Sequence, residues 1–281
     1  RLLLDTGSSG EEELSFDRPF ISGLAWSPDG ERLAYSVRSY SKEPSPEADG
    51  LWLLSLAAGT PIKLLDNQYL DRQTDNVLDV RVPRPLAWSP DGEALLLRMG
   101  YWEWSDVVWL EPVAPSAGDS NLHDPEGMWV EGSWSADGQS VWLSGLNQSV
   151  VSDLAQAGRR QAGVTLLLDG DVEALAFSRA QEVPEGLVFL GIDVMGDGTR
   201  LYLGSESDSD FTYEAIGPAD PLCHGGPVWD IVWDPTGQWA AVTCQEEVKL
   251  ISLDGGNQED LTPFLQPLDW PTERSVLFWG S

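Results

Sequence analysis

Short apolar runs alternate with turn residues along almost the whole chain, and stretches with a helical period are scarce. Apolar runs at 23–25 and 32–35 flank the segment Trp26–Gly30, and runs at 85–87 and 94–97 flank Trp88–Gly92. Two apolar runs joined by a few turn residues predict a β-hairpin. Proline suits the first central position of a type I turn, and glycine takes the left-handed position that closes a bulged hairpin. Each copy of this pattern therefore predicts one hairpin.

The hairpin pattern recurs along the chain. A third copy is Trp134–Gly138, a looser one is Trp233–Gly237, and Phe177 and Trp270 hold the equivalent position in two degenerate copies. Repetition at a period of about 40 to 50 residues, in units that cannot bury their own faces, is typical of a β-propeller. We predict that residues 1–281 form one all-β domain, a six-bladed β-propeller of four-stranded antiparallel blades. In each blade we expect this Trp or Phe, the anchor residue, to end the second strand.

The two ends of the chain complement each other in this scheme. The hairpin predicted at 267–279 has no outer strand after it, whereas Arg1–Gly7 is similar to Leu51–Ala57 and Val248–Gly255. We expect the latter two runs to be the outermost strands of their blades. Arg1–Asp5 is therefore predicted to complete the sixth blade and to close the ring, which would remove an open sheet edge.

The repeated motif also resembles a known family. The Trp-Ser-Pro-Asp-Gly hairpins at 26–30 and 88–92, with the Leu51–Leu54 type of strand that leads into a glycine turn, are similar to WD40-like propellers of the TolB type. The resemblance covers nearly the whole chain. It implies an extracytoplasmic protein, whether periplasmic, cell-surface or secreted, that mediates protein contacts. It extends to the propeller domains of prolyl oligopeptidase-like enzymes, in which the ring gates a separate hydrolase.

The charge of the chain limits the classes of partner. Forty-six acidic residues against sixteen basic ones give a net charge of −30. Such a field repels polyanions, so we expect no nucleic acid partner. The excess of acidic residues is consistent with solubility outside the cell or with adaptation to salt. The more specific functional explanations are binding of a cationic partner and binding of Ca²⁺. No apolar run approaches about 18 residues, so we expect no membrane span.

Cys223 and Cys244 are the two cysteines of the chain. The predicted strands place both toward the same face of the ring, which leaves two interpretations, a disulfide or two buried thiols. A disulfide would close a loop of about 22 residues and would stabilise the fold by roughly 3 kcal/mol. It would also indicate an oxidising compartment.

The long, dissimilar connections are the predicted recognition surface. In the predicted strand order they join strands one to two and three to four, at 39–50, 67–84, 100–106, 116–128 and 217–227. Variable loops on a rigid scaffold are where binding usually resides. The candidate partner-binding residues on them are Tyr101, Trp102, Trp104, Trp129, Trp229, His123 and His224. The other interpretation is that Trp102 and Trp104 cover a blade edge.

Catalytic and metal chemistry find little support in the sequence. Neither histidine has a convincing nucleophile beside it, so we predict no catalytic residues, no cofactor and no assigned metal site. Ca²⁺ stays an alternative at Asp169–Asp171 and Asp193–Gly198, although neither segment completes the twelve-residue calcium loop with a glutamate. Ser135–Trp142 resembles the Ser-X-Asp-X-Gly-X-X-Trp turns of six-bladed sialidases, but its glycine stands one residue early.

Together these observations favour a non-catalytic extracytoplasmic propeller. We expect it to bind a protein, or to build a surface assembly, through the face of the ring that carries the long connections, the loop face. The alternative is a carbohydrate-binding or glycoside-hydrolysing propeller that uses the same face.

Overall fold

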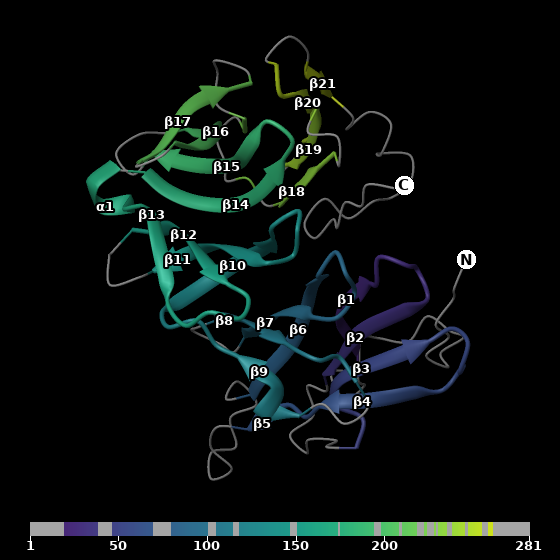
Figure 1. Ribbon diagram of the computed structural model, residues 1–281. Coiled ribbons are helices and arrows are strands. Elements are labelled where there is room, and N and C mark those ends of the chain that lie inside the picture. The colour runs from purple at the N-terminus through teal and green to yellow at the C-terminus, as the bar shows by residue number, and fades with distance from the viewer. Residues whose placement is uncertain are drawn as a thin grey trace.

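The computed structural model describes residues 20–38, 47–69, 80–100, 105–114, 118–146, 151–173, 175–193, 198–207, 210–217, 222–223, 228, 230–234, 238–244, 247–254 and 258–260. Over these residues the chain forms five antiparallel sheets, which succeed one another around the molecule as the blades of a propeller (Figure 1). The predicted all-β architecture of antiparallel blades is confirmed for these five.

The strands of each blade follow one another in chain order. Blade one holds β1 (Phe20–Trp26), β2 (Arg32–Arg38), β3 (Gly50–Ser55) and β4 (Pro61–Leu65). Blade two holds β5 (Gln68–Tyr69), β6 (Val80–Trp88), β7 (Leu95–Gly100), β8 (Ser105–Leu110) and β9 (Leu122–His123). Blade three holds β10 (Met128–Trp134), β11 (Ser140–Leu146), β12 (Asp153–Gly158) and β13 (Val164–Leu168).

The remaining described strands form two further blades. Blade four holds β14 (Leu175–Val183), β15 (Gly186–Asp193), β16 (Thr199–Ser207) and β17 (Asp210–Ile216). Blade five holds β18 (Asp230–Trp233), β19 (Trp239–Thr243), β20 (Val248–Ser252) and β21 (Gln258–Asp260). Two short helices, η1 (Asp119–Asn121) and α1 (Gly170–Glu173), lie between strands.

The predicted strand order within a blade needs one correction. In blades one, three, four and five the strand that bears the anchor residue is the first of its sheet, not the second. The strands β3 and β20, expected to be outermost, are third, because β4 and β21 pair outside them. The connection at 39–50 therefore joins the second strand of blade one to the third, 100–106 joins β7 to β8, and 217–227 lies between the last strand of blade four and the first of blade five. The stretch 67–84 is not a single connection, since β5 and the start of β6 lie within it. The stretch 116–128 is not a single connection, since β9 lies within it.

The repeated turns have the chemistry that the sequence predicts. Gly30, Gly92 and Gly138 have φ angles of 70°, 71° and 67°, in the left-handed region. In each turn the serine hydroxyl donates to the aspartate two residues later, at 2.5 Å in blade one, 2.6 Å in blade two and 2.8 Å in blade three. That aspartate also accepts a backbone N–H two residues further on. The turns of blades one to three are thus closed internally.

Apolar side chains fill the interfaces between neighbouring blades, so each core cluster is shared by two sheets. The anchors Trp88, Trp134 and Trp233 lie in these interfaces. The indole N–H of Trp88 donates to the carbonyl of Ala25 at 3.0 Å, and that of Trp134 donates to Ala87 at 3.2 Å. Each anchor therefore reaches the residue just before the anchor of the preceding blade.

The described part of the chain shows five blades. The predicted sixth blade depends on residues 267–279, and the predicted closure of the ring depends on Arg1–Asp5. Both segments lie outside the described residues. None of the helices that the structure describes is long and apolar enough to cross a membrane.

Candidate functional site

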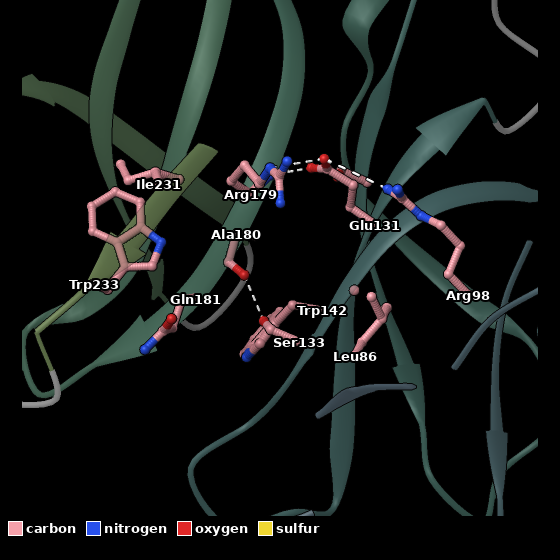
Figure 2. Close-up of a pocket in the computed structure, with 12 residues that line it drawn as sticks. Leu86, Arg98, Glu131, Ser133, Trp142, Arg179, Ala180, Gln181, Ile231 and Trp233 are labelled. Carbon is pink, nitrogen blue, oxygen red and sulfur yellow. Dashed lines mark hydrogen bonds and ion pairs between the residues drawn. The ribbon is translucent and has the colours of Figure 1, made fainter. Parts of the chain in front are cut away.

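A cavity of about 170 Å³ opens where strands β6, β10, β14 and β18 of blades two to five approach one another. In Figure 1 these strands, β6, β10, β14 and β18, surround the middle of the propeller. Figure 2 shows side chains that line this axial cavity, with an ion cluster on one side and the ring of Trp233 on another. Because the cavity is built from strands of four blades, its walls are parts of the rigid scaffold.

The ion cluster joins three consecutive blades. Glu131 of β10 lies between Arg98 of β7 and Arg179 of β14 (Figure 2). The Nε of Arg179 is 2.9 Å from the Oε1 of Glu131, whereas the nearest Arg98 nitrogen, Nη2, is 3.8 Å away. The Nε of Arg98 donates to the carbonyl of Val130 at 2.7 Å. Glu131 is thus hydrogen-bonded to one arginine and in looser contact with the other.

The alternation of side chains along β7 explains why Arg98 faces this site. Leu95, Leu97 and Met99 belong to the core shared with blade one, whereas Leu96 belongs to the core shared with blade three. Side chains two residues apart lie on the same face of a strand. Arg98 therefore points with Leu96 toward blade three, where Glu131 lies.

A bulge in β14 places Arg179. The pairing of β14 with β15 shifts register around this residue, and Arg179 has a φ of 54°, in the left-handed region. A residue with a side chain in this conformation costs roughly 1–2 kcal/mol. Two residues of β10 hold the bulge: Glu131 accepts the backbone N–H of Arg179 at 2.8 Å, and the Ser133 hydroxyl donates to the Ala180 carbonyl at 2.5 Å. The carboxylate that pairs with the Arg179 side chain also stabilises its unusual backbone.

Arg84 adds a further positive charge to the cluster. It lies directly opposite Arg98 in the pairing of β6 with β7, so the two side chains share a face of the sheet. Burial lowers the pKa of Arg98, the carboxylate of Glu131 opposes that effect, and the charges of Arg179 and Arg84 lower the pKa further. The charges of Arg84 and Arg179 thus both act on Arg98, beside the carboxylate of Glu131.

The other wall of the axial cavity is largely apolar. Leu86, Trp142, Ile231 and Trp233 line it, and the last three are buried. The indole N–H of Trp142 is 3.4 Å from a carboxylate oxygen of Glu182, which also accepts the backbone N–H of Ala136 at 3.0 Å. The cavity therefore combines a cationic side with an aromatic and aliphatic side, an arrangement suited to a ligand that has an anionic group on an apolar stem.

Two of the sequence-predicted partner residues lie in the described part of the chain. Trp129 is fully buried, donates its indole N–H to the carbonyl of Glu126 at 2.9 Å, and packs in the core between blades two and three. His123 is exposed at the end of β9 and stacks on Trp109, with ring centroids 5.7 Å apart. Trp129 is thus a packing residue, because the alternation of β10 turns its side chain inward, away from the loop surface.

The other predicted partner residues fall outside the described residues. They are Tyr101, Trp102, Trp104, Trp229 and His224. Their role in binding stays a prediction.

The two cysteines are joined. A disulfide links Cys223 and Cys244, whose Cα atoms are 5.7 Å apart. Both residues are buried in the core between blades four and five. Of the two interpretations that the sequence allows, a disulfide or two buried thiols, the structure shows the disulfide.

Neither segment considered for Ca²⁺ gains support. Among the described residues no group of three or more His, Cys, Asp or Glu side chains is placed to hold a metal ion. Asp169 accepts the backbone N–H groups of Asp171 and Val172 at 2.9 and 3.2 Å, so it caps α1. Asp193 lies at the end of β15, and the next four residues are outside the described part.

The residues of the ion cluster are absent from the sequence-based set of candidates. Arg84 and Arg98 stand within apolar strand runs of a chain in which acidic residues outnumber basic ones almost threefold. Arg179 stands where the better copies of the motif have proline. Arginine inside the strands of an acidic propeller is the signal that could have identified the site.

The fold has many solved relatives. TolB from Acinetobacter baumannii matches with a TM-score of 0.56 and 14% identity over 87% of this chain and 54% of that chain. Putative TolB from Agrobacterium tumefaciens gives 0.56 and 18% over 86% of this chain and 80% of that one. Prolyl oligopeptidase B from Galerina marginata gives 0.56 and 12%, over 87% and 35%.

These likenesses show that the chain has a TolB-like propeller fold. The chain spans about half the length of the Acinetobacter protein, 54%, and about a third of the peptidase, 35%. No protein-family model and no curated protein sequence matches the chain.

Proposed function

We propose that this chain is a non-catalytic, extracytoplasmic protein-binding propeller that receives part of a partner protein at the axial cavity. The observation that supports the proposal best is the cavity itself, because strands of four blades hold its charged and aromatic side chains in fixed positions. Preorganised side chains lose little conformational freedom on binding, which favours affinity. The likeness to TolB propellers agrees with this proposal.

The extracytoplasmic location is supported by the disulfide. Cys223 and Cys244 are bonded and buried. Disulfides of this kind form and persist in oxidising environments, such as the periplasm, the cell surface and the extracellular medium. The net charge of −30 is consistent with solubility there.

The proposed contact surface is the loop face around the mouth of the axial cavity. Met128 and Val130, at the start of β10, are 39% and 37% exposed, and the carbonyl of Val130 accepts a hydrogen bond from Arg98 of the ion cluster. An apolar rim beside a charged cavity is typical of binding sites. The loop residues Tyr101, Trp102, Trp104, Trp229 and His224 remain proposed contacts on this face.

Site-directed photocrosslinking tests the proposal. A photoreactive residue in place of Met128 should form one discrete adduct with a protein from an extracytoplasmic extract of the source organism. The same residue in place of Leu166, which is 41% exposed on β13, serves as the control and should form none. The adduct is identified by mass spectrometry and the partner is purified for titration against the unmodified chain.

The titration compares a second matched pair of variants. Val130→Asp should weaken binding of the purified partner at least tenfold, and Leu166→Asp should leave it unchanged. Equal adducts from both positions, or a partner that binds both variants alike, would contradict recognition at the cavity mouth. Adducts with glycans in place of protein would support the carbohydrate-binding alternative instead.

A further inference from the structure

We propose that the axial cavity binds a carboxylate group of the partner between the guanidinium groups of Arg98 and Arg179, and that Glu131 occupies this place in the unbound protein. The inference rests on the proposed function and adds the chemistry of the ligand to it. Its ligand is an acidic segment of a protein, which presents either a side-chain carboxylate or a chain terminus.

Positive charges gather at the site. The charges of Arg84 and Arg179 lower the pKa of Arg98, and the carboxylate of Glu131 lies beside both Arg98 and Arg179. Like charges directly opposite each other on paired strands are destabilising, as Arg84 and Arg98 are. A ligand carboxylate bound beside Arg98 would reduce this repulsion. The gathering of arginines is also notable in a chain that has 16 basic residues against 46 acidic ones.

The guanidinium group of Arg98 is oriented for a ligand. The Nη2 of Arg98 is 3.8 Å from the Glu131 carboxylate, beyond hydrogen-bond distance, and Arg98 is held at its Nε by the Val130 carbonyl. Figure 2 shows its guanidinium directed toward Glu131 at the edge of the cavity. The planar fork of arginine matches the two oxygens of a carboxylate. Arg98 is therefore fixed at one nitrogen and positioned to bind an incoming carboxylate with the others.

The apolar wall of the cavity offers a second contact surface. Ile231, Trp142 and Trp233 lie across the cavity from the ion cluster and are buried. They would seat the aliphatic part of a glutamate or a neighbouring apolar residue of the partner. Charge-assisted hydrogen bonds are stronger where water is excluded. The wall thus favours an acidic group that belongs to a peptide over a free hydrated anion.

The strained bulge ties Glu131 to this role. Glu131 holds the Arg179 backbone N–H at 2.8 Å with one oxygen and the Arg179 side chain at 2.9 Å with the other. A residue in a left-handed conformation persists only where its surroundings fix it, and such residues cluster at ligand sites. Glutamine at 131 keeps an oxygen for the backbone bond but loses the charge that competes with a ligand. The Glu131→Gln substitution therefore keeps the hydrogen bond that stabilises the bulge and removes the negative charge that occupies the ligand position.

Three blocked tripeptides serve as probes in a titration followed by calorimetry. Acetyl-Gly-Glu-Gly-amide and acetyl-Gly-Gly-Gly with a free carboxylate present the two sources of the group, and acetyl-Gly-Gln-Gly-amide presents neither. We expect at least one carboxylate probe to bind at least tenfold more tightly than the glutamine probe. The tighter of the two carboxylate probes tells which source the site prefers. Equal binding of all three, or of none, would overturn the proposal.

The variants locate the binding. Arg98→Gln and Arg179→Gln should each weaken carboxylate binding at least tenfold, whereas Arg200→Gln, an exposed arginine of β16 in blade four, should not change it. Arg179→Lys keeps the charge without the fork and should give an intermediate loss. This lysine variant keeps the test valid if Arg179→Gln unfolds, because a folded lysine variant with unchanged affinity would contradict the proposal.

Glu131→Gln gives the most specific result. If Glu131 occupies the ligand position, its neutral variant should bind the carboxylate probe about fivefold to tenfold more tightly. A purely structural role of Glu131 would leave affinity unchanged or lower it, and either result would overturn the assignment. The crosslinked partner distinguishes the carboxylate inference from the proposed function. If the partner binds Arg98→Gln and Arg179→Gln with the same affinity as the unmodified chain, the carboxylate inference is wrong but the proposed function stands.

Discussion

At the scale of single residues, Asp91 fastens two blades as well as closing its turn. Its Oδ1 accepts the Ser89 hydroxyl and the Glu93 backbone N–H, and its Oδ2 lies 2.6 Å from Nη1 of Arg159. The Arg159 side chain, from the turn after β12, is buried and also contacts Glu111 at 2.9 Å. A turn residue of blade two is thereby ion-paired with a buried arginine of blade three.

This pairing predicts an acid-sensitive interface. Burial of the Asp91 carboxyl raises its pKa, but hydrogen bonds from Ser89, Glu93 and Arg159, with the charge of Arg159, lower it overall from 3.8 to about 2. Because the folded pKa lies below the unfolded one, the contribution of Asp91 to stability is present above about pH 4 and is lost as the pH falls toward 2. In Asp91→Asn the free energy of unfolding should be lower at pH 7 and should converge with that of the unmodified chain near pH 2.

Urea denaturation between pH 7 and pH 2.5 measures this effect. Asp137→Asn is the matched control, since Asp137 has the same turn position in blade three and its pKa is also lowered, by the Gln139 N–H and the Ser135 hydroxyl. It should lose less stability than Asp91→Asn because Arg159 is not among the causes of its shift. An acid dependence as steep in Asp91→Asn as in the unmodified chain would refute the assignment.

At the scale of elements, β10 and β11 approach closely at the bulge that precedes Glu131. Gly145 of β11 pairs with Trp129 there, and the register shifts between Trp129 and Glu131. A Cβ added at Gly145 would lie 2.4 Å from the carbonyl oxygen of Met128 and 2.7 Å from the Cα of Trp129. Both are backbone atoms, which cannot move aside as the end of a side chain can.

Gly145→Ala should therefore destabilise the fold, by about 1–3 kcal/mol as for other overpacking substitutions. Thermal unfolding gives the melting temperature, and Gly118→Ala is the control, because a Cβ at Gly118 would meet nothing within 4 Å. The expected result is a lower melting temperature for the first variant alone. Equal melting of the two variants would show that the strands separate at little cost.

The sequence predicts elements better than it predicts the site. The turns of blades one to three follow from their serine, aspartate and glycine residues, whereas β21 is only three residues long and was missed as an outer strand. Alternation along β7 would have indicated the face of Arg98. Glu131 follows a register shift and Arg179 lies within one, and such a shift resets the alternation. No residue type in β10 or β14 predicts those bulges. The sequence therefore does not predict that Arg98, Glu131 and Arg179 lie close together.

At the scale of the whole molecule, blade one exposes a surface that the other blades bury. Its anchor Trp26 is 43% exposed, whereas the anchors Trp88 and Trp134 are 6% and 8% exposed. Each of the latter packs on a preceding blade. The repeat therefore predicts a further blade before blade one, and we propose that it combines residues 267–279 with Arg1–Asp5. The similarity of Arg1–Asp5 to β3 and β20 indicates the third strand of that blade.

Deletion of residues 1–6 tests the closed ring. The shortened chain should melt at a clearly lower temperature, because an unclosed propeller leaves a sheet edge and an apolar face in water. Leu3→Asp should have a similar but smaller effect, and Ser8→Asp, just after the glycine that follows the proposed strand, should have little. Unchanged melting of the shortened chain would contradict closure by this segment.

Blade four is joined to the preceding blade by different contacts, so the blades are not equivalent by rotation about the propeller axis. Its anchor is Phe177, whose phenyl ring has no N–H, so it cannot donate to blade three as Trp88 and Trp134 donate to their preceding blades. Blades three and four are joined instead through the bulge that holds Arg179. A ring of identical blades would offer a ligand as many equivalent rotational settings as it has blades. With charges on three neighbouring blades and aromatic rings opposite, this propeller offers one, so a polypeptide that enters it would be held in a single orientation about the axis.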